Sequence, residues 1–244
     1  QTKVEKAEIY KKIKENYFSI IIGTHALFNK EISFMNLNLL IIDEEHKFGV
    51  RQKEKIRSLK NGINVISLSA TPIPRTLNLS LSKVRDISLI TTPPTGRKSV
   101  KTIVSRYSKS LVFEAIQREF YRDGQVFYLL NNVSMLEEKK KEISDRFPGK
   151  KIAFAHGQLR PKELSKVMES FIRKEIDLLV CTTIIESGID IENANTLIVE
   201  ESENYGLSQL HQIRGRVGRS KREAYAYFFL NENKELKNKA SERI

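Results

Sequence analysis

Three carboxylates and an imidazole stand together directly after an apolar run, at Asp43, Glu44, Glu45 and His46. The preceding residues, 39–42, are Leu-Leu-Ile-Ile, a pattern typical of a strand buried on both faces of a parallel sheet. Open α/β sheets bind ligands at the carboxyl ends of their strands. Carboxylates placed there suit Mg²⁺ on a nucleoside triphosphate, with a neighbouring acid to orient the attacking water. A loop or a helix cap that carries the same acids is the alternative.

Arginines and glycines alternate late in the chain, where residues 212–219 are Gln-Ile-Arg-Gly-Arg-Val-Gly-Arg. Arginine offers phosphoryl oxygens a rigid two-pronged donor, and glycine lets the backbone approach a ligand closely. A run of charge is usually a solvated surface. Here the glycine interruptions and the three-residue step from Arg216 to Arg219 favour an arginine-finger site that contacts phosphate.

A small polar turn follows another apolar run near the start of the chain. Residues 19–22 are Ser-Ile-Ile-Ile, which we expect to form a buried strand, and Gly23, Thr24 and His25 come directly after it. This turn can cap a helix through Thr24. It can equally place backbone N–H groups and the Thr24 hydroxyl on a phosphate.

Two hydroxyl residues, Ser69 and Thr71, follow the short strand that residues 65–68 predict. Prolines at 72 and 74 prevent an early helix and make this polar loop stiff. A hydroxyl pair beside the acidic loop can sense the state of a metal site. Capping of the following helix would also explain the two hydroxyls.

A further polar loop follows the strand that residues 176–182 predict. It contains Thr183, Gly188 and Asp190, which can place a hydroxyl on a phosphate and a carboxylate near a ribose. Taken alone, this sequence is equally typical of a surface loop without a function. Its position between the acidic cluster and the arginine run favours the functional interpretation.

The composition is that of a globular chain of about two domains, with 244 residues, 40% hydrophobic and 30% charged. The net charge of +12 suits a surface that meets nucleic acid, although a lysine-rich composition alone gives the same total. The single cysteine, Cys181, excludes an internal disulfide and fits a reducing cytoplasm. No apolar run approaches the roughly 18 residues of a membrane span.

Predicted strands and helices alternate along the chain and must position these motifs. This alternation predicts an α/β fold with parallel sheets and right-handed crossovers. A run rich in proline and hydroxyls at 91–99 indicates a boundary between two domains, and its Lys98 lacks the spacing of a phosphate-binding loop. Helices are expected at 1–16, 48–59, 111–121, 135–147 and 164–171, and further strands at 125–130, 152–155 and 196–200.

Four of these clusters, in this order, resemble motifs II, III, V and VI of the superfamily 2 helicases: residues 43–46, 69–71, 183–190 and 212–219. Longer stretches resemble the RecG and Mfd branch, and more closely the transcription-repair coupling factors: residues 43–53, 70–77, 155–159, 181–191 and 205–212. The resemblance implies two RecA-like parallel-sheet lobes, the first incomplete, and a short helical C-terminal tail. It divides the chain into lobe 1 at 1–92, a linker at 93–105, lobe 2 at 106–231 and the start of the tail at 232–244.

The resemblance also implies ATP and Mg²⁺ as cofactors. Asp43 would hold Mg²⁺ through its water shell, Glu44 would polarise the attacking water, and Arg216 and Arg219 would reach the γ-phosphate. The residues implied to complete the nucleotide site or couple hydrolysis to movement are Glu45, His46, Ser69, Thr71, Gly188, Asp190 and Gln212. Those implied to contact the DNA backbone are Gly23, Thr24, His25, His156 and Thr183.

The family's activity is ATP-driven movement on double-stranded DNA, which displaces stalled RNA polymerase and brings in excision-repair proteins. The resemblance therefore implies DNA, RNA polymerase and repair proteins as partners, the last two through domains outside these residues. The family's phosphate loop lies upstream of the first matched motif, so we expect a fragment that is inactive alone. A RecG-like fork-reversal helicase and a non-catalytic module that binds DNA or a partner are the alternatives.

Overall fold

The structure is a computed structural model that describes residues 3–29, 31–44, 48–59, 62–69, 86–92, 98–183 and 191–231. The chain divides into two units, Gln1–Ala70 and Thr71–Ile244, which are described separately below. Within the described ranges, no helix is long and apolar enough to cross a membrane.

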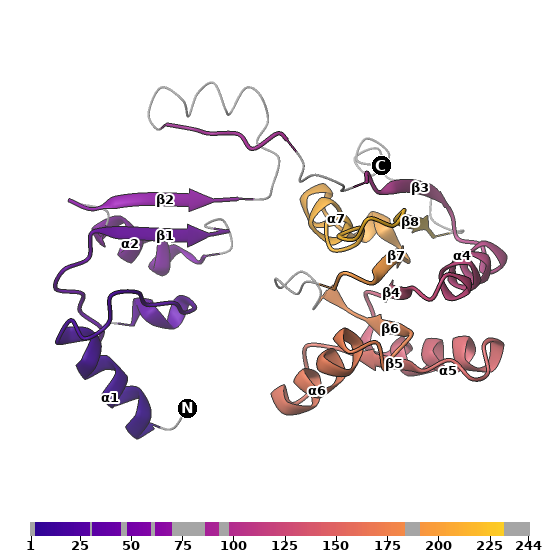
Figure 1. The fold of residues 1–244 in the computed structure, drawn as a ribbon, viewed down its shortest axis with the longest axis horizontal. Helices are drawn as coiled ribbons and strands as arrows, with labels where there is room; N and C mark the ends of the chain where they lie inside the picture. The colour runs from indigo at the N-terminus through magenta and orange to yellow at the C-terminus, as the bar shows by residue number, and fades with distance from the viewer. Residues whose placement is uncertain are drawn as a thin grey trace. The chain divides into compact units, whose positions relative to one another are not determined.

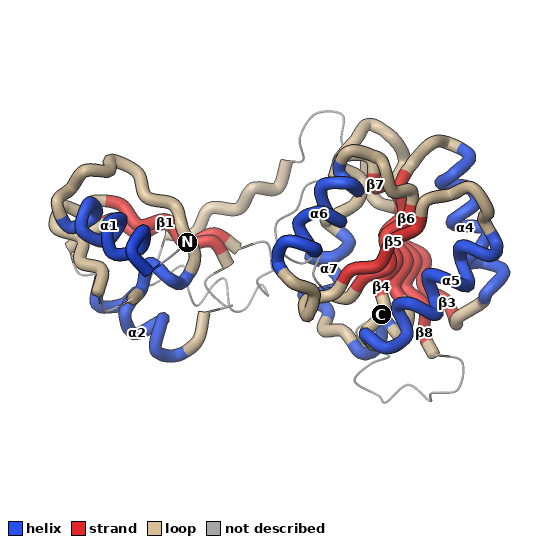
Figure 2. The backbone as a smooth tube through the Cα atoms, turned by 90° about the horizontal axis from the view of Figure 1, so that it is seen from below, coloured by secondary structure: helices blue, strands red, loops and turns tan. Residues whose placement is uncertain are grey.

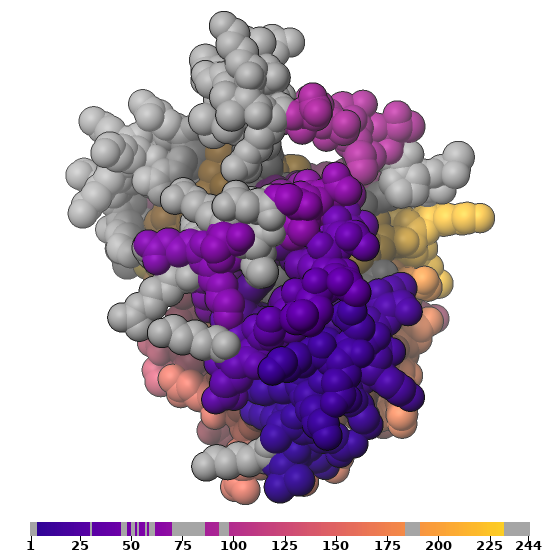
Figure 3. Space-filling model, turned by 90° about the vertical axis from the view of Figure 1, so that its left-hand side faces the viewer, coloured from indigo at the N-terminus to yellow at the C-terminus, as the bar shows by residue number. Residues whose placement is uncertain are grey.

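Unit 1 contains a two-stranded parallel sheet with helical segments beside it (Figure 1). Asp43, the last residue of one strand, is in register with Leu68 of the other. A small core of isoleucines joins the sheet to the helices, and Figure 3 shows the surface of this unit in space-filling form. Its elements are α1 (Lys3–Lys14), the 3-10 turn η1 (His25–Phe28), β1 (Leu39–Asp43), α2 (Val50–Leu59) and β2 (Asn64–Leu68).

Two expectations for unit 1 were wrong. Residues 19–22 form no strand, and Ile20 and Ile22 are 81% and 94% exposed. β1 is a parallel strand as expected, but Ile41 is 57% exposed while Ile42 is 3% exposed, so only one of its faces is buried. The physical reason is the same in both cases. An apolar run becomes a two-sided buried strand only where neighbouring elements cover it, and the described residues of this unit supply one such layer.

Unit 2 is built on a parallel sheet of six strands in the order β3-β8-β7-β4-β6-β5. β4 and β7 are completely buried because each has a strand on both sides and a helical layer on both faces. The strands are β3 (Lys101–Arg106), β4 (Gln125–Leu129), β5 (Ile152–Ala155), β6 (Leu178–Cys181), β7 (Ala194–Val199) and β8 (Tyr225–Leu230). The helices are α4 (Lys109–Tyr121), α5 (Leu136–Arg146), α6 (Pro161–Ile172) and α7 (Leu207–Arg214), with 3-10 turns η3 (Val133–Met135) and η5 (Ser202–Asn204).

Helices cover both faces of this sheet, with α4 and α5 on one face and α6 and α7 on the other (Figure 2). Two separate apolar clusters result. The first includes Phe171, Leu210 and Ile213, and the second includes Ile116 and Ile143. The expected α/β fold with parallel strands is therefore confirmed.

The expected linker at 93–105 extends too far. Residues 101–106 form β3, which pairs along its whole length with β8, so the last part of the expected linker belongs to the sheet of unit 2. β3 was missed because it is an edge strand whose residues are all exposed or partly exposed, so it lacks a long apolar run. Residues 93–97 and the expected tail at 232–244 lie outside the described residues.

Candidate nucleotide and nucleic-acid site

The acidic motif begins where β1 ends. Asp43 is the last residue of the strand, and its side chain is exposed. Glu44 has a positive φ of 52°, a conformation that non-glycine residues rarely adopt, and its N–H donates to the Leu68 carbonyl at 2.9 Å. The backbone thus turns sharply at the strand end while the neighbouring strand holds it.

Ser69 lies at the same edge of the sheet, because it follows Leu68, the partner of Asp43 in the parallel register. Adjacent strands are about 4.8 Å apart, so the loops after β1 and β2 begin side by side. The structure therefore brings Asp43, Glu44 and Ser69 together. The other members of these two motifs, Glu45, His46 and Thr71, lie outside the described residues.

A magnesium ion would fit this strand end without a dedicated cage. No group of three or more His, Cys, Asp or Glu in the described part of the chain could hold a metal. Magnesium bound to a nucleotide does not need one, since it keeps several waters and takes phosphate oxygens with one or two carboxylates. The exposed carboxylate of Asp43 matches that requirement.

Thr24 serves as a helix cap in the structure. It precedes η1, and its hydroxyl accepts a hydrogen bond from the Ala26 N–H at 3.4 Å. Gly23 packs closely there, since a Cβ on it would lie 2.8 Å from Leu27 Cγ. Gly23, Thr24 and His25 are all exposed, so the capped turn presents its polar groups to solvent.

In unit 2, His156 and Thr183 follow two neighbouring strands, β5 and β6. The pairing of Ala155 with Cys181 sets these strand ends side by side, and the Thr182 N–H reaches the Ala155 carbonyl at 3.4 Å. The His156 ring stacks on Phe154, and its buried Nδ1 has no hydrogen-bond partner among the described residues. Gly188 and Asp190 lie outside the described residues.

The arginine run begins on α7 and continues into the loop before β8. Gln212 lies on the helix, and Gly215 ends it. Arg216 is partly buried, whereas Arg219 is exposed and its Nε donates to the Gly215 carbonyl at 3.3 Å. Gly218 between them has a φ of 72°, which glycine alone adopts without strain. The loop therefore presents Arg219 outward from a tightly wound backbone.

His211 on α7 lies beside this run. Arg214 Nη2 is 3.0 Å from His211 Nδ1, so the neutral ring accepts a hydrogen bond from the guanidinium. Partial burial and then the Arg214 charge lower the pKa of His211. The helix that leads to the arginine run thus carries an imidazole held neutral.

A partly buried polar network that sequence reasoning missed lies where β4 and β7 end. Lys139 Nζ is 2.9 Å from both Glu200 Oε1 and Glu142 Oε2, and Tyr128 donates its hydroxyl hydrogen to Glu200. Burial opposes the charge on Lys139, but the Glu200 and Glu142 carboxylates outweigh it and raise its pKa. Burial and the Glu200 charge also raise the pKa of Tyr128. The network fixes α5 to the strand ends. In the sequence, the only feature that points to it is the charge of Lys139 within a helix.

Two family models match the chain: "DEAD/DEAH box helicase" over residues 1–79 and "Helicase conserved C-terminal domain" over residues 109–221. Among curated relatives, the transcription-repair-coupling factor of Staphylococcus epidermidis is 50% identical over 244 residues, 100% of this chain and 21% of that protein. The protein of the same name from Staphylococcus haemolyticus is 51% identical over 232 residues, 95% of this chain and 20% of that protein. The chain thus spans about a fifth of the length of these relatives.

Solved structures agree with these matches. RecG bound to a three-way DNA junction is 36% identical with a TM-score of 0.70, covering 100% of this chain and 32% of that one. A DEAD box protein from the hyperthermophile Methanococcus jannaschii is 19% identical with a TM-score of 0.51, covering 96% of this chain and 60% of that one. The second likeness concerns the fold alone.

Proposed function

Because this chain belongs to the superfamily 2 helicases, we propose that it is the ATP-dependent, double-stranded DNA translocase core of a transcription-coupled repair factor. The observation that carries the proposal is the 50% identity to a transcription-repair-coupling factor, which extends over all 244 residues. The whole protein would use ATP hydrolysis to move on DNA and displace a stalled RNA polymerase. Excision-repair proteins would be recruited through regions outside these residues.

In this proposal lobe 1 comprises residues 1–92 and lobe 2 comprises residues 106–231, each with a RecA-like sheet. Both lobes would contribute to ATP binding, with Asp43 as the residue that would hold Mg²⁺ and Glu44 as the residue that would orient the attacking water. When bound, Mg²⁺ neutralises charge on the β- and γ-phosphates. Glu45, His46, Ser69 and Thr71 couple that state to lobe movement. The left-handed backbone of Glu44 supports its role, since strained conformations concentrate at functional sites.

Lobe 2 would complete the site from the other side. Arg216 and Arg219 stabilise the negative charge that develops on the transferred phosphoryl group, and Gln212, Gly188 and Asp190 contact the nucleotide. Hydrolysis would then remove the γ-phosphate that these residues contact, and the lobes would separate.

The DNA grip would consist of backbone contacts from both lobes. Thr24 with its neighbours Gly23 and His25 contributes from lobe 1, and Thr183 and His156 contribute from lobe 2. Contacts to phosphates position a protein without reading bases, as movement over arbitrary sequence requires. The net charge of +12 supports attraction to the DNA.

Removing a finger arginine tests the proposal. In the full-length gene product, Arg216→Ala or Arg219→Ala should lower DNA-stimulated ATP turnover about a thousandfold, because a finger arginine acts mainly in the transition state. Steady-state ATP hydrolysis and thermal melting measure the effect and the folding. Lys221→Ala is the matched control, since Lys221 is exposed in the same loop. Near-normal turnover in both arginine variants would refute the assignment.

A RecG-like fork-reversal helicase is the second candidate, supported by the 36% identity to RecG over the whole chain. The two candidates differ in substrate. Release of a stalled RNA polymerase from linear DNA supports the coupling factor, and regression of a model fork without polymerase release supports the alternative. A non-catalytic module would be indicated by a gene that lacks a phosphate-binding loop upstream of Gln1.

A further inference from the structure

The loop that carries Arg219 is fixed on both sides of that residue to the beginning of β7. On one side, the Gly218 N–H donates to the Ala194 carbonyl at 3.4 Å. On the other, Ser220 Oγ donates to Asn195 Oδ1 at 2.8 Å, and Asn195 is completely buried. The two anchors immediately flank Arg219, so they determine where its backbone lies.

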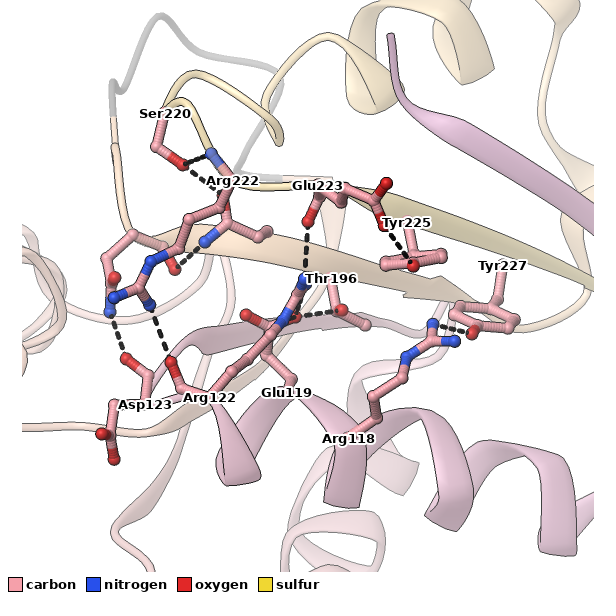
Figure 4. A network of polar contacts seen from close by, with 12 residues as sticks. Arg118, Glu119, Arg122, Asp123, Thr196, Ser220, Arg222, Glu223, Tyr225 and Tyr227 are labelled. Atoms are coloured by element: carbon pink, nitrogen blue, oxygen red, sulfur yellow. Dashed lines mark hydrogen bonds and ion pairs between the residues drawn. The ribbon is translucent and has the colours of Figure 1, made fainter. Parts of the chain in front are cut away.

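A second set of contacts ties the same loop to the end of α4 (Figure 4). Arg122 Nη1 donates to the Glu223 carbonyl at 2.7 Å, and Arg222 Nη1 donates to the Arg122 carbonyl at 2.7 Å. These two bonds run in opposite directions between the same two segments. They form a clasp that includes both a side chain and the backbone of Arg122.

Glu119 holds Arg122 in the orientation that this clasp needs. Its carboxylate is completely buried, and Oε2 accepts hydrogen bonds from Arg122 Nε at 3.1 Å, from Arg122 Nη2 and from the Thr196 hydroxyl (Figure 4). With two of its nitrogens on Glu119, the planar guanidinium leaves Nη1 directed at the Glu223 carbonyl.

Gly124 makes room for this carboxylate. A Cβ on Gly124 would lie 1.6 Å from Glu119 Oε1, so no other residue fits there without moving the acid. A buried carboxylate is costly unless it is paired and hydrogen-bonded. Glu119 Oε2 has its partners at the end of α4 and on β7, and Arg122 connects the acid to the loop that carries Arg219.

We propose that Arg122, oriented by Glu119, is a positioning residue for Arg219. The inference rests on the proposed function, in which Arg219 acts as an arginine finger. A finger works only when its guanidinium is placed to about 1 Å, and a displacement of that size can lower turnover about a hundredfold. The clasp would fix the position of Arg219 to this accuracy, although Arg122 lies 97 residues earlier in the chain.

Arg122→Lys in the full-length gene product tests the proposal. Lysine keeps the charge beside Glu119, but its single nitrogen cannot hold the acid and the Glu223 carbonyl in the fixed geometry of the guanidinium. We expect kcat for ATP hydrolysis to fall about tenfold to a hundredfold with KM for ATP changed less than about threefold. The matched control is Arg118→Lys, four residues earlier on α4, where the guanidinium bonds Tyr227 and stacks 3.7 Å from the Tyr225 ring centroid. That variant should lower the melting temperature and leave kcat unchanged.

A double-mutant cycle separates positioning from a general loss of structure. In the Arg219→Ala background, Arg122→Lys should lower kcat no further, whereas its effect on the melting temperature should be the same in both backgrounds. Unchanged kcat in Arg122→Lys alone, or an equal fall of kcat in both backgrounds, would overturn the proposal. Normal turnover in Arg219→Ala would instead refute the finger assignment and, with it, this inference.

Discussion

Glu44 and Gly218 both adopt positive φ angles next to proposed functional groups, at 52° and 72°. For Glu44 this conformation costs about 1–2 kcal/mol. The hydrogen bond from its N–H to the Leu68 carbonyl offsets part of that cost and fixes the strand end. For Gly218 the conformation itself costs little, but Ala224 and Val100 pack so closely that they leave no room for a side chain. At both positions the backbone, and not only the side chains, shapes the proposed site.

Gly218→Ala should destabilise the protein by about 2–4 kcal/mol, because it adds left-handed strain to overpacking. A Cβ at this position would lie 2.8 Å from Ala224 Cβ and 3.0 Å from Val100 Cγ2. Thermal melting of this chain followed by circular dichroism measures the effect.

Gly149→Ala is the control, because Gly149 has a φ of 89° and a Cβ there would meet nothing within 4 Å. It should cost about 1 kcal/mol, the strain alone. Equal losses in the two variants would contradict the close packing around Gly218.

For the acidic motif, the sequence predicted the place in the fold, because a strand end carries these residues. Asp43 and Glu44 follow an apolar run, and the structure places them at the end of β1. Glu119 and Arg122 were not predictable, since in the sequence they are two of many charges on a helix. Their role depends on partners at Thr196 and Glu223, and spacing along the chain does not reveal which distant segment lies opposite a helix.

Among the elements of unit 2, apolar runs predicted four of the six strands of the sheet and missed β3 at one edge and β8 beside it. Residues 125–130 and 152–155 were predicted as strands, and β4 and β5 lie there. Residues 19–22 have a similar pattern and form no strand. Strand formation requires a partner, and an apolar run does not show whether one is present. β8 was missed although its sequence, Tyr-Ala-Tyr-Phe-Phe-Leu, is a six-residue apolar run that could have revealed it.

Helix α7 should become less stable in mild acid because of His211. Its pKa lies below the ordinary value of 6.5, since burial and Arg214 disfavour the charged ring. The folded state therefore binds fewer protons than the unfolded state near pH 6. The resulting stability is fully present above pH 6.5 and is lost as the pH falls through the lower, folded pKa. The ring is largely solvated, so the effect is on the order of a few tenths of a kcal/mol.

The measurement is the fall in melting temperature between pH 7.5 and pH 5.5. It should be smaller for His211→Gln than for the parent chain, since glutamine can accept the hydrogen bond from Arg214 and does not titrate. An identical fall in the two proteins would show that His211 does not contribute.

For the whole molecule, the proposed nucleotide site takes residues from both units. The acids are in unit 1 at the end of β1, and the arginines are in unit 2 after α7. Each sheet positions its own residues, so the proposed chemistry requires the two sets of residues to meet. In the proposed mechanism, this division is what would link hydrolysis to movement of one unit against the other.

The distance between the two units is the decisive measurement for a nucleotide site that both units share. Spin labels can be placed at Ser58→Cys on α2 and Ser165→Cys on α6, which are both exposed. Cys181 should remain unlabelled, since it is buried and burial raises the pKa of its thiol. Pulsed electron–electron distance measurements on the full-length gene product, with its other reactive cysteines replaced, compare the free state with that bound to Mg²⁺ and a non-hydrolysable ATP analogue.

We predict that the analogue converts a broad distribution of distances between the labels into one narrow population. This narrowing should be lost when Arg216 and Arg219 are both changed to alanine. Distances that do not respond to the nucleotide, or that narrow equally without the two arginines, would contradict a site shared between the units.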